Sequence, residues 1–216
     1  MIGGGAAGFF AAISCKRHYP KARVVIHEKS SKLLAKVKIS GGGRCNVTHH
    51  CLQPSRLSKH YPRGGRFLKK AFSQFSVSDT IDWFESRGVK LKTEPDNRMF
   101  PISDDSQTIV DCLQQEVDKL GITVLTMSGV RSIEVHKEGF ELEVDTQPAL
   151  FYDKVVVCAG GSPKLSGFDW LKKSGHHIEP PVPSLFTFNM PNEPIRKLMG
   201  LSVENAQVKI QGTKLQ

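Results

Sequence analysis

The chain has 216 residues, a formal net charge of +9 and 39% hydrophobic residues, a composition typical of a folded globular protein. It contains neither an apolar run of membrane-spanning length nor an N-terminal signal peptide, so we expect neither membrane anchoring nor export. Its five cysteines, an odd number, fall in segments predicted as helix, loop and strand. This pattern indicates reduced thiols and a cytoplasmic protein.

The excess of positive charge is compatible with a nucleic-acid partner, with an anionic cofactor or with a plain solvated surface. The lysines and arginines are spread along the chain, and none of the aromatic and basic motifs of RNA-binding modules is present. This favours the solvated surface and argues against nucleic acid.

A glycine-rich turn opens the chain, where residues 3–8 read Gly-Gly-Gly-Ala-Ala-Gly and match G-x-G-x-x-G before a helix-forming segment. Gly3 permits a tight turn, Gly5 lets the backbone approach a pyrophosphate, and Gly8 allows close packing of the helix. The N-terminal amides of that helix would face the phosphates. The pattern predicts a dinucleotide site, although a plain glycine turn is the alternative.

The context of this turn supports a dinucleotide. A β-rich run at residues 23–27 is followed by Glu28, about twenty residues after the last glycine, where a carboxylate hydrogen-bonds ribose hydroxyls. An acid there favours FAD or NAD over NADP, whose extra phosphate it would repel. Only Met1 and Ile2 precede the turn, so the first strand is expected to be truncated.

A second glycine run, residues 40–48, reads Ser-Gly-Gly-Gly-Arg-Cys-Asn-Val-Thr. Consecutive glycines such as Gly42 and Gly43 cost chain entropy unless a ligand lies against the main chain. Arg44 offers a partner for a phosphate, Asn46 offers a donor and an acceptor, and Lys36 adds positive charge. A flexible linker is the alternative.

Together the two glycine motifs resemble those of the bacterial BaiN-like or aminoacetone-oxidase-like NAD(P)/FAD-dependent oxidoreductases. The resemblance implies an FAD-binding flavoprotein fold about twice as long as this chain, with an inserted β-rich domain. It also implies that these residues line the FAD: Ala6, Ala7, Glu28, Lys29, Lys36, Gly43, Arg44, Cys45 and Asn46.

The neighbouring residues Cys45, His49, His50 and Cys51 do not have the paired spacing and distant second pair of a typical zinc site. We therefore expect no metal. A flavin disulfide reductase would need a C-x-x-C or similar pair, and the sequence has none.

The middle of the chain is predicted to be mainly helical. Phe67, Phe72 and Phe75 fall on one face of a helix and are expected in the core. A later helix is expected over residues 107–120, capped by the Ser-Asp-Asp-Ser run before it and ended by Gly121.

Residues 122–125 are predicted to form a buried strand of the nucleotide-binding sheet, and a two-faced hairpin is predicted to follow with its turn near Glu138 and Gly139. By resemblance to flavoproteins, the main chain of Val130 touches the adenine.

Residues 154–161, Lys-Val-Val-Val-Cys-Ala-Gly-Gly, are predicted to form a continuous buried strand that ends at a ligand. Gly160 and Gly161 would let the backbone pass close to the pyrophosphate. The segment resembles the second flavoprotein signature, in which Ala159 occupies a cofactor position.

The sequence thus predicts an α/β fold: a doubly wound, FAD-binding Rossmann-like domain over residues 1–185 with a central parallel sheet and a β-hairpin or meander. Residues 186–216 are expected to begin an inserted β-rich domain. Because the resemblance covers only the first half of the family, we expect a fragment of a longer enzyme.

The expected function is an FAD-dependent oxidoreductase that moves hydride or electrons between a small organic substrate and NAD(P)H or oxygen. The flavin would carry the chemistry, so we name no catalytic residue. The alternatives are a tRNA-modifying flavoprotein and a nucleotide-binding module without catalysis. The sequence does not indicate an oligomeric state.

Overall fold

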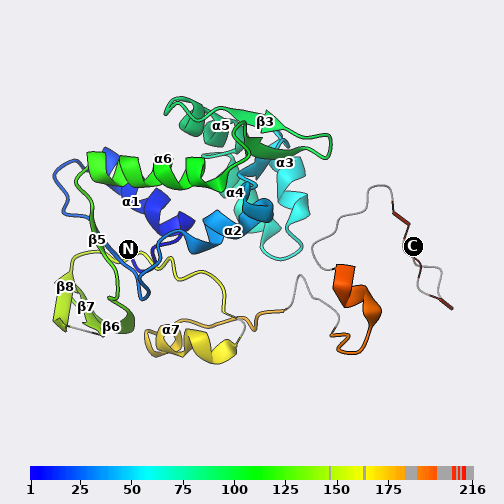
Figure 1. Ribbon diagram of the computed structural model, residues 1–216. Coiled ribbons are helices and arrows are strands. Elements are labelled where there is room, and N and C mark those ends of the chain that lie inside the picture. The colour runs from blue at the N-terminus through cyan, green and yellow to red at the C-terminus, as the bar shows by residue number, and fades with distance from the viewer. Residues whose placement is uncertain are drawn as a thin grey trace. The chain divides into compact units, whose positions relative to one another are not determined.

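Figure 1 shows a computed structural model of the chain, which describes residues 1–145, 147–162, 164–182, 189–198, 206–207, 209 and 211–212. The chain divides into two compact units, Met1–Pro180 and Pro181–Gln216, and each is described by itself. In the second unit a short 3-10 helix, η3, covers Pro194–Leu198. The expected domain boundary at residues 185 and 186 lies outside the described residues, as do many of residues 186–216, which are expected to begin an inserted β-rich domain.

The first unit contains short strands and helices along its whole length. Its helices are α1 (Ala6–His18), α2 (Ala35–Gly43), α3 (Pro54–Leu57), η1 (Ser58–His60), α4 (Gly65–Phe72), α5 (Val77–Glu85), α6 (Ser106–Lys119), η2 (Leu165–Phe168) and α7 (Asp169–Lys173). Its strands are β1 (Val25–His27), β2 (Thr48–His49), β3 (Leu91–Thr93), β4 (Arg98–Pro101), β5 (Thr123–Leu125), β6 (Val130–His136), β7 (Gly139–Val144) and β8 (Gln147–Tyr152). Among the described residues, no helix is long and apolar enough to cross a membrane.

A small parallel sheet brings together four segments that are far apart in the sequence of the first unit. Strands β1 and β5 pair in parallel, with Ile26 opposite Val124. Ile2 forms parallel bridges to both His27 and Val157, which gives the spatial order β5, β1, Ile2, Val157. The first, second and third strands of a Rossmann fold adjoin in this way. The predicted Rossmann-like α/β class is therefore confirmed.

The predicted strand at residues 154–161 is shorter and more exposed than the sequence indicates. In the structure only Val157 forms a bridge, and Val156 and Val157 are 43% and 40% exposed. Ile26, which lies between two neighbouring strands, is 0% exposed. Within the described residues Val157 pairs with a neighbour on one side only, namely Ile2. Its side chain is therefore more exposed than the continuous apolar run of residues 155–157 predicts.

Helix α6 covers the first two helices and closes the main core. It packs against α1 and α2, as Figure 1 shows. Its start is capped as predicted, because the Asp105 side chain accepts a hydrogen bond of 2.8 Å from the Gln107 amide. Phe9 and Ile13 of α1 and Leu113 of α6 are buried in the shared core. This core holds α1 against the sheet and fixes the direction of its N-terminus.

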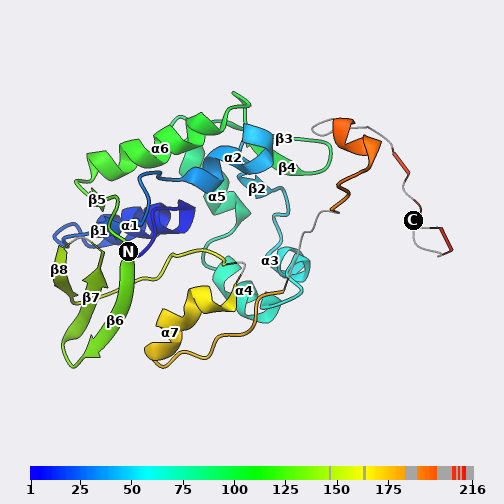
Figure 2. The same cartoon turned by 60° about the horizontal axis from the view of Figure 1, so that its bottom comes forward.

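Two antiparallel sheets flank this arrangement. Strands β2, β4 and β3 form one of them, and β6, β7 and β8 form a three-stranded meander whose strands lie side by side in Figure 2. Phe140 pairs with Val135 and Leu142 with Ile133, so the predicted hairpin is confirmed.

The aromatic residues of the middle helices are not all in the core. Phe67 on α4 is 81% exposed and Phe75 is 41% exposed, which contradicts the prediction that both are buried. Helix α4 is only eight residues long, and it turns Phe72 inward, where its ring lies 5.6 Å from that of Tyr61. Phe67 falls on the opposite side of the helix and faces solvent.

Candidate functional site

The glycines of the first turn differ in the space around them. At Gly3, where φ is +115°, an added Cβ would lie 2.4 Å from the carbonyl oxygen of Cys158, and at Gly8 it would lie 1.9 Å from the carbonyl oxygen of Gly3. At Gly5 an added Cβ would meet nothing within 4 Å. Gly3 and Gly8 are therefore required for packing inside the protein. Gly5, the N-cap of α1, faces open space into which the first amides of the helix point.

Glu28 lies directly after β1 and is tied to this turn. Its Oε2 accepts a hydrogen bond of 2.8 Å from the Gly4 amide, and its Oε1 accepts bonds of 2.9 Å from the amide and hydroxyl of Ser30. Burial alone would raise the pKa of Glu28, but these bonds and the charge of Lys29 lower it below its usual value. The carboxylate is thus held ionised beside the glycine turn.

The second glycine run breaks a helix. The α2 segment is regular up to Ile39, and Ser40, Gly41 and Gly42 then leave the helical conformation. Gly41, Gly42 and Gly43 have φ values of +57°, +70° and +86°. A Cβ at Gly41 would lie 2.8 Å from both the Asn46 nitrogen and the Phe100 ring, whereas Gly42 and Gly43 border open space. The run is an ordered turn, which argues against a flexible linker.

The structure brings the two glycine segments to one cavity of about 580 Å³. From the first segment and α1 it is lined by Ala6 and Ala7, and from α2 and the following turn by Lys36, Cys45 and Asn46. All five are predicted cofactor residues. The remaining lining residues are Phe10, Val37, Ser40, Val47, Phe75, Thr80, Phe84, Ile109 and Leu113, so most of the wall is apolar.

Arg44 has partners within the protein. Its guanidinium forms ion pairs with Glu94 and Asp104 and lies 4.0 Å from the centre of the Phe100 ring. The bond to Glu94 raises the pKa of Arg44 above its ordinary value. The structure therefore places its charge over β4 and its neighbouring turns, where two carboxylates already balance it.

Cys45 is a buried thiol at a strained position. Its φ is +61°, rare for a residue with a side chain, and its side chain is 6% exposed. Burial raises the pKa of the thiol, so it is neutral at physiological pH. Its amide donates a hydrogen bond of 3.0 Å to the carbonyl of Ser40, which closes the turn of the glycine run.

The third glycine segment adjoins the first. The backbone of Cys158 and Ala159 lies against Gly3, and a Cβ at Gly3 would be 3.3 Å from the Cα of Ala159. Gly160 has φ of +71°, and a Cβ built there would lie 3.8 Å from Lys36 Nζ. Gly161 borders open space. Lys36 thus reaches from α2 to the turn after Val157.

The residues expected near the adenine lie in neighbouring segments. Lys29 is exposed, and a Cβ at Gly129 would lie 3.1 Å from its Cβ. The amide of Ser128 donates a hydrogen bond of 2.8 Å to the carbonyl of Glu28. Val130, the next residue but one, opens β6 opposite Val144. The segment before β6 therefore runs beside the residues that follow β1.

Several residues of this region were not predicted from the sequence to belong to a site. Ser30 orients Glu28, and Phe10, Phe75 and Thr80 line the cavity. A serine two residues after an acid is a common local hydrogen-bonding pattern, and this spacing could have identified Ser30. The contributions of Phe75 and Thr80 depend on tertiary packing and left no signal in the sequence.

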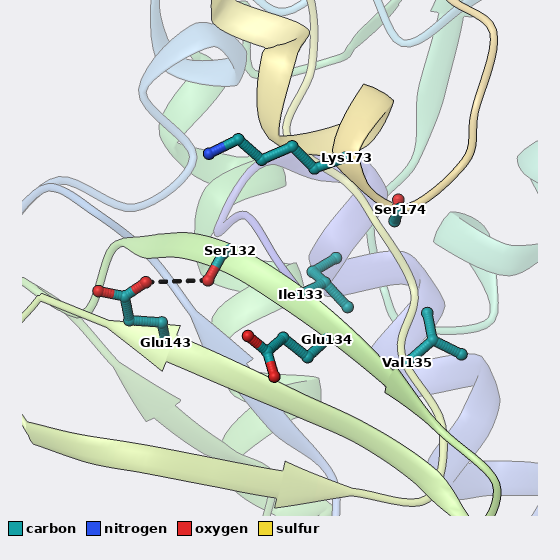
Figure 3. A pocket seen from close by; sticks show the side chains of 7 residues that line it. All are labelled: Ser132, Ile133, Glu134, Val135, Glu143, Lys173 and Ser174. Carbon is teal, nitrogen blue, oxygen red and sulfur yellow. Dashed lines mark hydrogen bonds between the residues drawn. The ribbon is translucent and has the colours of Figure 1, made fainter.

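A second cavity, shown in Figure 3, has a different character. It has a volume of about 630 Å³ and is lined by residues of β6, β7 and the end of α7. Ser132 donates a hydrogen bond of 2.9 Å to Glu143, and Lys173 extends over the same opening. None of the predicted cofactor residues lines it. The cavity beside the glycine segments and this second cavity are therefore two separate sites.

Comparisons with known proteins agree with this architecture. The chain is 28% identical over 212 residues to the 3-dehydro-bile acid delta(4,6)-reductase of Clostridium scindens, an alignment that covers 94% of this chain and 50% of the relative. It is 29% identical over 222 residues to the ribosomal RNA dihydrouridine synthase of Escherichia coli, covering 99% and 54%. The chain spans about half the length of these curated relatives.

A solved structure shares the fold. The 3-ketosteroid-delta4-(5alpha)-dehydrogenase of Rhodococcus jostii aligns with a TM-score of 0.51 at 15% identity, covering 69% of this chain and 42% of the other. The family model described as HI0933-like protein Rossmann domain matches residues 1–212. The chain therefore belongs to the HI0933-like Rossmann-domain family, the BaiN-like flavoproteins that its two glycine motifs resemble.

Proposed function

We propose that the chain forms the FAD-binding part of an oxidoreductase that moves hydride or electrons between a small organic substrate and NAD(P)H or oxygen. One observation carries the proposal: the Gly3–Gly8 turn is crowded at Gly3 and Gly8 but open at Gly5. A glycine that is open on the side of a helix N-terminus leaves room for a pyrophosphate.

The other predicted residues fit the remaining parts of an extended dinucleotide. Glu28 is ionised and lies beside the turn, where it can accept hydrogen bonds from ribose hydroxyls. Lys36 and Gly160 lie together and can approach the phosphates. Ala6, Ala7, Cys45 and Asn46 line the apolar cavity, which suits a flat ring system.

When bound, FAD would supply the hydride chemistry. The residues of this chain would bind and orient it: the α1 amides and Lys36 at the phosphates, Glu28 at the ribose, and Val130 with Lys29 at the adenine end. The apolar residues of the cavity would exclude water from the ring. A reductase among the relatives agrees with redox chemistry on a small molecule.

A second candidate is an RNA-modifying flavoprotein. It is favoured by a ribosomal RNA dihydrouridine synthase among the relatives and by a stretch of fifty residues, 29–78, that contains no acidic side chain. Both candidates require FAD, so cofactor binding tests what they share.

The visible spectrum of the purified protein tests the proposal. We would record it for this chain and for the gene product extended in both directions, each supplied with FAD. Flavin absorbance that stays with the protein through gel filtration supports the proposal. Absence of bound flavin from both forms would mean that the glycine segments bind another ligand.

A further inference from the structure

The positive net charge of this protein comes from one part of the sequence, which corrects the expectation that the lysines and arginines are simply spread along the chain. Residues 29–78 contain eleven lysines and arginines and no aspartate or glutamate, a formal charge of +11. The rest of the chain carries a formal charge of −2. An ordinary solvated surface intersperses charges of both signs, so a stretch of this length without a single acid calls for a physical explanation.

Five of these cations lie on three short helices, and a sixth, Arg63, lies in the turn between the second and the third. We call residues 54–72, which include α3, η1 and α4, the basic segment. Its cations, all exposed, are Arg56, Lys59, Arg63, Arg66, Lys69 and Lys70. None of the six makes an ion pair with any residue of the part of the chain that the structure describes. Their charges are therefore available to an external anion.

The basic segment is anchored by its apolar residues. Leu57 is 9% exposed and belongs to a buried cluster with Val77 and Met99, against which Phe72 also packs. The start of α4 lies close to η1: a Cβ added at Gly65 would be only 2.5 Å from the carbonyl oxygen of Ser58. The α3, η1 and α4 helices accordingly lie together in both views (Figures 1 and 2). The cations are thus presented on a folded surface.

Two aromatic rings are exposed among these cations. Phe67 is 81% exposed and Tyr61 is 43% exposed. Phe67 lies next to Arg66 in sequence and three residues before Lys70, so the ring and these charges share neighbouring positions on α4. Exposed rings among cations can stack on unpaired bases while the cations bind the phosphates.

We propose that the basic segment binds single-stranded RNA, with the six cations on the phosphates and Phe67 and Tyr61 stacked on bases. A duplex offers no free base faces to these rings, and unpaired bases occur chiefly in the loops of RNA. An anionic membrane fits less well, because Leu57, Leu68 and Phe72 are buried or half-buried. Phe67 and Tyr61 alone do not make the continuous apolar face with which a helix enters a bilayer surface. This inference goes beyond the proposed cofactor chemistry and does not require FAD, so the two proposals can fail separately.

The surface also adjoins the proposed flavin site. A cavity of about 380 Å³ is lined by Asn46 and Val47 from the turn after the glycine run and by Tyr61 and Phe72 from the basic segment. Asn46 and Val47 line the larger cavity as well. A strand bound on the basic segment would therefore pass beside residues that also line the proposed cofactor cavity.

Fluorescence anisotropy with a labelled single-stranded RNA of about 12 nucleotides tests the proposal. The key variant is Arg66→Gln/Lys69→Gln/Lys70→Gln. The matched control, Lys21→Gln/Lys90→Gln/Lys137→Gln, removes the same charge from exposed positions outside the segment. Loss of three phosphate contacts should raise Kd at least about tenfold and reduce the slope of log Kd against log salt by about 2. The control should change Kd by no more than about twofold.

A second variant separates stacking from charge. Phe67→Ala should raise Kd about tenfold and leave the salt slope unchanged, because stacking releases no counterions. Equal weakening in the two triple variants would overturn the proposal by showing that only net charge matters. Binding to vesicles of phosphatidylserine without binding to RNA would also overturn it and would assign the surface to a membrane.

Discussion

The carboxylate of Glu28 is bound to the backbone of Gly4, with 2.8 Å between Glu28 Oε2 and the Gly4 nitrogen. This bond, together with the 2.7 Å bond from the Gly3 amide to the His27 carbonyl, joins the end of β1 to the first glycine turn. It brings the acid beside the turn even though 19 residues separate it from Gly8 in the sequence. The proposed binding of ribose by Glu28 depends on this fixed position.

Glu28→Ala should weaken FAD binding and lower stability together. The substitution removes the proposed ribose acceptor and leaves the Gly4 and Ser30 amides without their partner. Hydrogen bonds to charged groups contribute about 1.5 to 3 kcal/mol, so we expect Kd for FAD to rise about tenfold or more. Isothermal titration with FAD measures it. His50→Ala, at an exposed residue outside the site, serves as the control, and an unchanged Kd in Glu28→Ala would refute the ribose placement.

Gly8→Ala should destabilise the fold. Its Cβ would lie 1.9 Å from the carbonyl oxygen of Gly3, and neither the helix nor the strand can move without disturbing the core. Overpacking of this kind costs about 3 kcal/mol. Urea denaturation followed by circular dichroism measures the loss. Gly5→Ser is the control, because its side chain enters open space and serine is a favoured N-cap, so its free energy of unfolding should match or exceed that of the wild type.

His27 should make stability dependent on pH. It is 2% exposed, and its ring nitrogens lie 2.8 Å from the hydroxyls of Ser128 and Tyr152. Burial lowers the pKa of His27, so the folded state favours the neutral ring and binds a proton less readily than the unfolded chain. The stabilisation is therefore complete above the unfolded pKa of about 6.5 and is lost as pH falls below it.

Urea denaturation at pH 7.5 and at pH 5.5 measures this effect. The wild type should lose about 1 kcal/mol more stability over this range than His27→Gln, which cannot gain the proton. Equal losses in the two proteins would show that His27 does not titrate against folding.

Glu116→Gln should be strongly destabilising. The Glu116 side chain is 7% exposed and pairs with Arg17 of α1 and with Arg87, whose Nε lies 3.0 Å from Glu116 Oε2. Because Arg87 is itself 11% exposed, removal of the carboxylate leaves a buried cation without its counter-ion. The expected loss is about 3 kcal/mol by urea denaturation. Glu141→Gln, which removes an exposed partner of His136, should cost less than about 1 kcal/mol. Similar losses in both variants would contradict this account.

The sequence predicted those parts of the fold that depend on local patterns. The roles of Gly3, Gly5 and Gly8 follow from the lack of a side chain at fixed spacing, and the space around each agrees with them. The cap at Asp105 and the alternation around Phe140 are also local. The prediction that these glycines bind a cofactor is an inference from such local rules, and the measurements above test it.

Features that depend on tertiary position were not predictable. Val156 and Val157 match a buried strand by composition, but an edge position leaves them exposed. Arg44 looked free for a phosphate, yet Glu94 and Asp104, fifty and sixty residues away, pair with it. Phe67 follows a helical apolar pattern, but the orientation of a short helix turns it to solvent.

The most direct test of the proposed cofactor site is a titration of FAD into the wild type and into Gly5→Ser. The serine should leave the fold intact but fill the open space at the N-terminus of α1, and its hydroxyl would bind the amides that a phosphate needs. Our account predicts that the wild type binds FAD and that Gly5→Ser binds it at least about tenfold more weakly, with matching circular dichroism spectra. Equal affinity in the two folded proteins would contradict the placement of the pyrophosphate at this turn.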